Sequence, residues 1–172
     1  NDVMNHSATH PDMTKLSKEQ MATELQKTAD TIESICGVRP AVFRPPFGSY
    51  NNALIETCES LGYKVIQWSV DSLDWKDYGT DSIVRTVLHH KNLKNGAIIL
   101  MHNGAKYTKS ALDAVITGLK EMGYEIVPTM QSKNTIIFGP ARNLVLGYDT
   151  FDSHIEYKLI DMRDTTGDNM FR

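Results

Sequence analysis

Two histidines stand four residues apart near the start of the chain, in the segment NHSATH at Asn5–His10. On one helical turn, side chains at this spacing share a face, so the imidazoles of His6 and His10 can reach one divalent ion. Zinc also needs a third protein ligand, usually a carboxylate or another histidine, and an open position for water. The alternative interpretation is a pair of surface or capping histidines.

The segment FRPPFGSYN, at Phe43–Asn51, carries an arginine followed by two prolines and a glycine. The prolines fix the backbone and Gly48 allows it to turn, so the N–H groups around Phe47 can be held in place. A preorganised backbone N–H is what an oxyanion requires. The alternative is a structural turn with a surface arginine at Arg44.

Two more segments carry groups suited to proton transfer. In VDSLDW a carboxylate at Asp74 precedes Trp75, and such a carboxylate can orient a histidine while the indole forms a pocket wall. In ILMHNG, His102 directly follows an apolar run and is suited to act as a general acid or base at neutral pH. Loop aspartates such as Asp71 often only turn the backbone, and a histidine after a strand is often structural.

Strands and helices are expected to alternate along most of the chain. The strands are expected at 41–43, 64–70, 97–101 and 124–127, and the helices at about 18–36, 52–61, 81–91 and 108–122. Ser17 and Gln20 form a capping box, Gly37 ends the first helix, and Thr108 caps the fourth. This pattern predicts an α/β fold with a parallel sheet, open or closed into a barrel.

The candidate polar groups follow the expected strands at their carboxyl ends, where α/β proteins build their sites. Arg44 follows one strand, Asp71 and Asp74 another, and His102 a third, while Val3-Met4 before the histidine pair is read as the stub of a further strand. Their convergence on one rim indicates an enzyme.

Composition excludes several other classes of protein. The 172 residues are 41% hydrophobic and 23% charged, with a net charge of −3. No basic excess points to nucleic acid, and no apolar run is long enough for a transmembrane segment. The first ten residues lack the basic and apolar regions of a signal peptide. Cys36 and Cys58 are expected to be buried free thiols.

Four segments of the chain, taken together and in order, resemble four of the five motifs of polysaccharide deacetylases of the NodB-homology type, carbohydrate esterase family 4. These segments are HSATH, FRPPFGSYN, DSLDW and LMH. The resemblance covers approximately residues 1–130, and the sequence between the motifs is most similar to that of bacterial peptidoglycan deacetylases of the sporulation type. It implies a distorted (β/α) barrel and a divalent metal, most often zinc, held by an aspartate and two histidines.

The resemblance also implies a role for each matched residue. His6 and His10 are the two histidine ligands, Arg44 holds the catalytic base, and the Phe47 N–H stabilises the oxyanion. Asp74 orients His102, which protonates the leaving amine. The acetyl pocket is walled by Trp75 and Leu100.

The chain departs from the family's pattern at one motif. The first motif, T-F-D-D-G or a close variant, supplies the base and the third metal ligand ahead of the histidine pair, and no such motif stands before His6. We therefore expect a barrel lacking its N-terminal strand–helix units, with weak or no activity from these 172 residues alone. A separate N-terminal segment or a second copy would cover the sheet edge. Alternatively, the run Asn143–Asp149 replaces the first strand and brings Asp149, or as a weaker candidate Asp152, near the metal.

The predicted function is removal of N-acetyl groups from a cell-wall polysaccharide, peptidoglycan or a chitin-like glycan, by a metal-dependent hydrolase. The alternative is a non-catalytic glycan- or metal-binding module. The resemblance implies a secreted or cell-envelope protein with a glycan substrate. Residues 1–130 are assigned to the deacetylase domain and 131–172 to a C-terminal extension of unknown role, in which TIIF, NLVLGY and HIEYKLI resemble strands without intervening helices.

Overall fold

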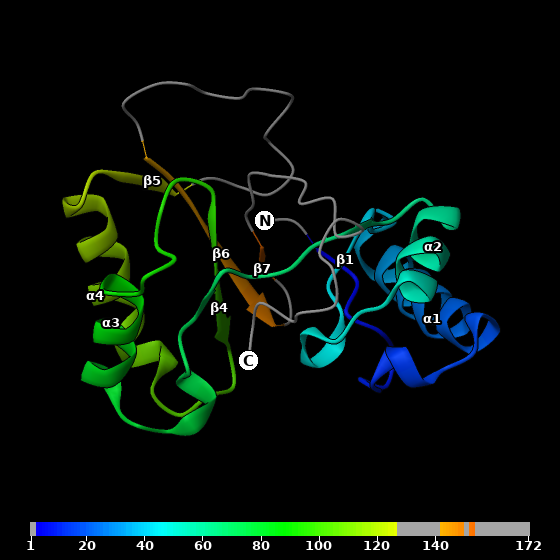
Figure 1. Ribbon diagram of the computed structural model, residues 1–172, viewed down its shortest axis with the longest axis horizontal. Coiled ribbons are helices and arrows are strands. Elements are labelled where there is room, and N and C mark those ends of the chain that lie inside the picture. The colour runs from blue at the N-terminus through cyan, green and yellow to red at the C-terminus, as the bar shows by residue number, and fades with distance from the viewer. Residues whose placement is uncertain (1–2, 127–141, 150–151, 154–172) are drawn as a thin grey trace.

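The computed structural model describes residues 3–126, 142–149 and 152–153 (Figure 1). The α-helices are α1 (Lys18–Cys36), α2 (Asn52–Ser60), α3 (Thr80–Leu88) and α4 (Thr108–Glu121). Short 3-10 helices are η1 (Met13–Lys15), η2 (Pro46–Gly48) and η3 (Asp74–Lys76). The strands are β1 (Val42–Phe43), β2 (Lys64–Val65), β3 (Val70–Asp71), β4 (Ala97–His102), β5 (Tyr124–Ile126), β6 (Arg142–Asp149) and β7 (Asp152–Ser153).

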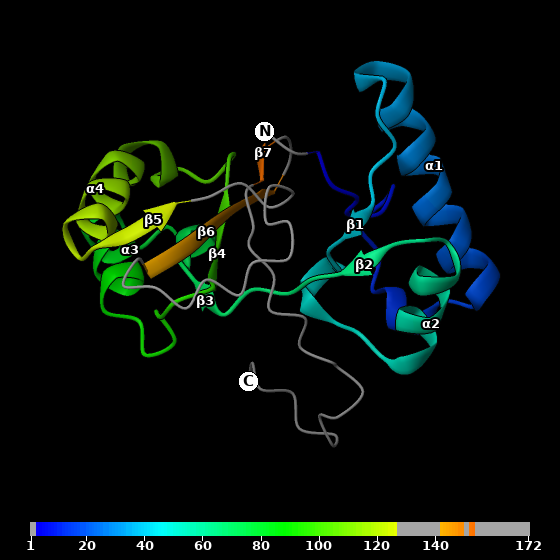
Figure 2. The same ribbon diagram turned by 90° about the horizontal axis from the view of Figure 1, so that it is seen from above.

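The strands form two sheets within the described residues. β1 and β2 pair in parallel, and the second sheet has the order β3-β4-β6-β5, all parallel, with β7 added antiparallel to β6. Figure 2 shows α1 and α2 beside the small sheet, and α3 and α4 beside the large one. The predicted α/β class with parallel strands is confirmed, while closure into a barrel stays a prediction.

Each sheet has its own hydrophobic core. Met21, Leu25 and Ala29 of α1 pack with Phe43 and Leu54 beside the small sheet. The larger cluster joins α3, α4 and the β3–β5 strands, and its buried members are Val70, Ile83, Val87, Ala97, Ile99, Met101, Ala111, Val115, Leu119 and Tyr124. A third, smaller cluster joins the two sheets, in which Val42 of β1 and Ile66 pack with Met4 and with Ile98 of β4.

The first helix confirms the capping prediction. The Ser17 hydroxyl accepts from the Gln20 N–H at 3.3 Å, and the Gln20 side chain accepts from the Ser17 N–H at 2.9 Å. Gly37 ends α1 at φ 70°, in the left-handed region that glycine adopts without steric cost. α1 is consequently a well-defined support for the loops packed against it.

Three local predictions are wrong. The single strand expected at 64–70 is two strands in different sheets, because β2 pairs with β1 and β3 pairs with β4. Tyr107, not Thr108, is the residue before α4, and the Thr108 hydroxyl is engaged elsewhere. Cys58 is a buried free thiol as expected, but Cys36 is exposed at the end of α1.

Several expectations for the rest of the chain are settled only in part. The predicted strand at 143–149 is present as β6, next to β4 and β5. The expected strands TIIF and HIEYKLI lie outside the described residues. Instead of a stub strand at Val3-Met4, Asn5 forms a single parallel bridge with Phe43. No helix among the described residues is long and apolar enough to cross a membrane.

Candidate active site

The backbone of Asn5 fixes the start of the histidine segment against β1. Its N–H donates to the Val42 carbonyl at 2.9 Å, and its own carbonyl accepts from the Arg44 N–H at 3.0 Å. His6 and His10 follow in a loop, not in the helical turn assumed from their spacing, but their rings still lie 4.9 Å apart, centroid to centroid. The structure therefore brings the two predicted ligands together.

The surroundings of His6 keep its imidazole neutral. Its Nδ1 lies 2.6 Å from the Arg44 carbonyl oxygen, a contact that requires a hydrogen on Nδ1 and leaves Nε2 as the basic nitrogen. Burial, reinforced by the charge of Arg44, lowers the pKa of His6 to about 3. A neutral imidazole whose second nitrogen donates to a carbonyl has the arrangement found around histidine ligands of metals.

Arg44 and Phe47 lie beside this pair. Arg44 is buried, and burial lowers its pKa to about 10, so the guanidinium stays charged at neutral pH. Phe47 adopts φ 58°, ψ 5° in η2, and its ring, 66% exposed, makes an edge contact with the His10 ring at 4.6 Å. The stiff loop predicted from its prolines therefore places Phe47 next to the histidine pair.

Asp74 and His102 form a second polar pair, joined by direct hydrogen bonds. The Asp74 side chain is fully buried, and its Oδ1 lies 2.7 Å from His102 Nδ1. Its Oδ2 accepts from the His102 N–H and from the Thr108 hydroxyl, both at 2.6 Å. Burial alone would raise the pKa of Asp74, but these hydrogen bonds bring it below the ordinary value, so the carboxylate is ionised.

This pair has the geometry of an oriented acid–base histidine. When Asp74 accepts from the Nδ1–H of His102, Nε2 becomes the nitrogen that can exchange a proton with a ligand. Electrostatic interactions with Arg44, His10 and His102 all contribute to the lowered pKa of His6. The two halves of the predicted site thus lie close enough to act on one another electrostatically.

The other predicted residues differ in exposure. Trp75 is 55% exposed and Leu100 only 5%. The Asp71 carboxylate accepts from the Leu73 N–H at 2.9 Å. Asp71 therefore turns the backbone, which is the structural role expected of a loop aspartate. Trp75 and Leu100 therefore offer an accessible indole and a packed aliphatic wall, and their substrate-binding roles stay predictions.

The donor set fits a metal only in part. His6 and His10 supply two adjacent imidazoles, and zinc in a catalytic site takes three protein ligands. Among residues 3–126, no group of three histidine, cysteine or acidic side chains is arranged to hold a metal ion. In the backbone register of the large sheet, Asp149 is paired with His102 at the carboxyl ends of β6 and β4. The two histidines accordingly account for part of a metal site.

Sequence reasoning missed four residues that hold this site in place. Asn5 and Glu24 bond to the histidine loop, Gln67 donates to the Gly48 carbonyl at 2.9 Å, and Thr108 donates to Asp74. The only sequence signal was a polar side chain beside an apolar stripe or a strand, which is also typical of an ordinary surface residue.

Comparison with known proteins agrees with this geometry. A family model described as polysaccharide deacetylase matches residues 1–66, which include His6, His10, Arg44 and Phe47. A family 4 carbohydrate esterase from Streptomyces lividans, solved in complex with acetate, superposes with a TM-score of 0.66 at 38% identity, over 70% of this chain and 62% of that one. The chain belongs to the polysaccharide deacetylase family. Its α/β fold is similar to that of the NodB-type domain of carbohydrate esterase family 4.

Two further relatives show the range within this family. A peptidoglycan-N-acetylglucosamine deacetylase of Listeria monocytogenes is 38% identical over 125 residues, which are 73% of this chain and 26% of that protein. A family 4 pseudoenzyme from Bacillus anthracis is 38% identical with a TM-score of 0.66, over 70% of this chain and 42% of that one. The chain thus spans about a quarter to three fifths of the length of these relatives.

Proposed function

We propose that this chain is part of a metal-dependent hydrolase that removes N-acetyl groups from a cell-wall polysaccharide. The observation that carries the proposal is the Asp74–His102 pair, in which a fully buried carboxylate holds Nδ1 of the histidine at 2.7 Å. A glycan-binding module has no need of a histidine oriented in this way. Membership of a deacetylase family supports the same reaction class.

In this proposal the residues of the chain divide the tasks of amide hydrolysis. His102 gives a proton to the departing amine, and Asp74 keeps it in the required tautomer. The Phe47 N–H stabilises the oxyanion, and Arg44 holds the carboxylate that acts as base. Trp75 and Leu100 wall the acetyl pocket.

We propose His6 and His10 as two ligands of a divalent metal, with zinc as the expected ion. The neutral state of His6 and the 4.9 Å separation of the rings support this assignment. When bound, the metal would polarise the acetyl carbonyl and lower the pKa of a water molecule. The third ligand must come from a carboxylate or histidine elsewhere in the folded protein, and we propose that the two sheets are parts of a distorted barrel whose remaining strands come from a further segment or a second copy.

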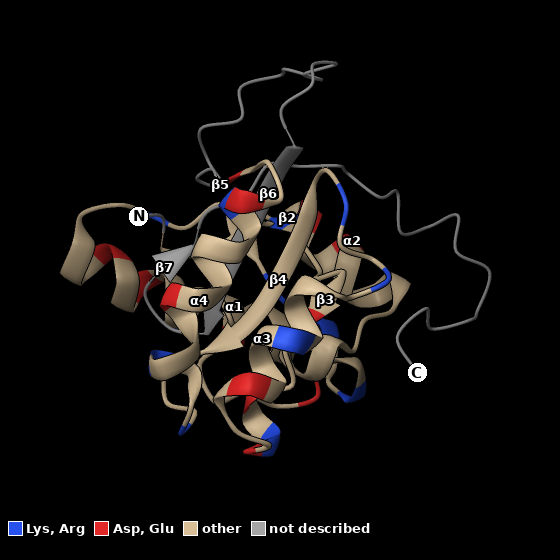
Figure 3. Ribbon diagram, turned by 90° about the vertical axis from the view of Figure 1, so that its left-hand side faces the viewer, with Lys and Arg blue, Asp and Glu red and all other residues tan. Residues whose placement is uncertain are grey.

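The substrate is proposed to be an N-acetylated glycan of the cell envelope, such as peptidoglycan. The Listeria relative is named for deacetylation of N-acetylglucosamine in peptidoglycan, which supports this substrate class. Charges of both signs alternate over α3, α4 and their loops (Figure 3), a distribution with no basic stripe for nucleic acid. An envelope location follows from the proposed substrate.

Acetate release from peptidoglycan and from N-acetylglucosamine oligomers, with zinc added, tests this function. Turnover is expected to be slow, because the described residues hold only two metal ligands, so the assay runs to an end point. We expect His102→Asn to lower release about a hundredfold or more, the contribution of a general acid. His89→Gln, an exposed histidine at the end of α3, is the matched control. Binding to insoluble peptidoglycan without any acetate release would instead identify a non-catalytic glycan-binding module.

A further inference from the structure

The loop that carries the two histidines has an unfavourable backbone conformation. Ser7 and His10 adopt positive φ angles of 67° and 54°, although neither is glycine. Side chains with a Cβ avoid this region, so such a loop persists only where its surroundings hold it. Within the loop, the His10 N–H donates to the Ser7 hydroxyl at 3.0 Å. The contacts that fix the loop from outside therefore decide where both imidazoles lie.

One carboxylate on α1 supplies three of these contacts. Glu24 Oε2 accepts from the N–H groups of Ala8 at 2.9 Å and Thr9 at 2.8 Å. Its Oε1 accepts from the Thr9 hydroxyl at 2.9 Å. Hydrogen bonds to an ionised carboxylate are stronger than those between neutral groups, and this carboxylate bridges the middle of the loop between the two histidines.

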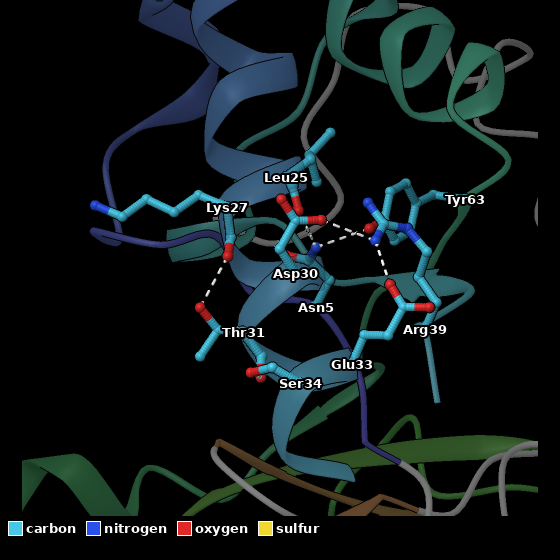
Figure 4. Close-up of polar contacts among 9 residues, drawn as sticks. All are labelled: Asn5, Leu25, Lys27, Asp30, Thr31, Glu33, Ser34, Arg39 and Tyr63. Carbon is cyan, nitrogen blue, oxygen red and sulfur yellow. Dashed lines mark hydrogen bonds and ion pairs between the residues drawn. The ribbon is translucent and has the colours of Figure 1, made fainter. Parts of the chain in front are cut away.

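A second contact from the same turn of α1 fixes the start of the loop. The fully buried Asn5 donates through Nδ2 to the Leu25 carbonyl at 2.7 Å and to the Tyr63 hydroxyl oxygen at 3.0 Å (Figure 4). Its Oδ1 accepts from the Ser7 N–H at 3.0 Å. Residues 5–9 are thus attached to two consecutive residues of a rigid helix, Glu24 and Leu25.

We propose that Glu24 is a positioning residue that holds the His6–His10 loop in the conformation in which both imidazoles share one metal site. The proposal deepens the proposed function and rests on it for the metal. The hydrogen bonds that Glu24 accepts from the loop come from Ala8 and Thr9 and not from an imidazole. Glu24 acts through the backbone of Ala8 and Thr9, which connects the two ligands.

The test compares Glu24→Ala, Glu24→Gln and the wild-type chain, with Glu33→Ala as the matched control. Glu33 lies on the same helix and carries the same charge, but pairs with Arg39, which keeps its second partner, Asp30. Two readouts are needed: the affinity for zinc ion alone, measured by competition with a chelator, and the protection of the Ala8 and Thr9 amides from hydrogen exchange without metal.

We expect Glu24→Ala to weaken zinc binding 10- to 100-fold, the effect typical of groups that orient metal ligands, and to lower the amide protection about tenfold or more. Glu24→Gln keeps one acceptor oxygen and should fall between Glu24→Ala and wild type. It also serves if Glu24→Ala does not fold. Glu33→Ala should match wild type in both readouts.

The two readouts separate failure of this proposal from failure of the proposed function. Wild-type zinc affinity and amide protection in Glu24→Ala would overturn the positioning role. A wild-type chain without measurable zinc affinity would contradict His6 and His10 as a zinc site that these 172 residues complete by themselves, and amide protection would then decide by itself whether Glu24 holds the loop.

Discussion

Gly48, directly after Phe47, is the position at which a single added methyl group should test the packing of the site. The backbone of Gly48 has φ +69°, and a Cβ placed there would lie 2.7 Å from Trp68 Cη2 and 3.0 Å from Gln67 Nε2. Gly37, at the end of α1, has nearly the same φ of +70°, but a Cβ at that position would have no neighbour within 4 Å. The two glycines therefore share the conformational demand and differ in the space around them.

The expected cost of Gly48→Ala is the sum of two effects. Placing a residue with a Cβ in the left-handed region costs about 1 kcal/mol, and this is the whole effect expected for Gly37→Ala. Inserting a methyl group into a filled space adds about 1–3 kcal/mol, because the Trp68 ring must move and Gln67 must give up its hydrogen bond to Gly48. Gly48→Ala should thus lower the free energy of unfolding by about 2–4 kcal/mol.

Urea unfolding of both variants, alone and with Trp68→Phe, measures these contributions. Phenylalanine lacks the outer indole ring, so both close Trp68 atoms, Cη2 and Cζ2, are removed. In the Trp68→Phe background, Gly48→Ala should cost about 1–2 kcal/mol less than in wild type, a coupling typical of residues in contact. The reasoning is refuted if Gly48→Ala is no more destabilising than Gly37→Ala, or if Trp68→Phe gives no relief.

Three more outcomes are expected. Because burial and a nearby guanidinium lower the folded-state pKa of His6 to about 3, this residue favours folding above pH 6.5 and loses that contribution as the pH falls toward 3. In urea unfolding with a metal chelator present, the free energy of unfolding of wild type should fall by about 2 kcal/mol more between pH 7 and pH 5 than that of His6→Asn. Parallel pH curves for the two proteins would contradict the lowered pKa of His6. Thr108→Val removes a donor from the buried Asp74 carboxylate and should cost about 1–3 kcal/mol in the same assay, against a smaller change for Thr31→Val on the exposed face of α1. If Asp149 is the third metal ligand, as its register beside the end of β4 allows, Asp149→Asn lowers zinc affinity at least tenfold in chelator competition, and unchanged affinity removes it from the site.

The elements that the sequence predicts well are those specified by local contacts. The capping box of Ser17 and Gln20 and the left-handed Gly37 each involve residues within one turn of the helix end, and both are present. The apolar run at Ala97–Met101 likewise predicts β4, which extends one residue further to His102. Since polar residues at strand ends are specified in the same local way, the positions of Arg44, Asp74 and His102 could also be anticipated.

The elements that the sequence predicts poorly depend on distant partners. The alternation in KVIQWSV is typical of one strand, but the choice of sheet depends on β1 for Lys64–Val65 and on β4 for Val70–Asp71. Gln67 and Trp68, between them, instead contact Gly48. Periodicity reports which residues face a core and says nothing about which strand lies alongside.

The same limit applies to the residues that hold the site together, and it has a consequence for how the site fails. The histidine loop is held by Glu24, the Phe47 loop by Gln67 and the Asp74 carboxylate by Thr108, each from a different element. Local patterns could not predict these contacts, because the partners are 15 to 34 residues apart in sequence. Since the three contacts share no partner, their effects on the free energy of unfolding should add. The site is therefore three separately supported loops, and damage to one support should impair its own loop first.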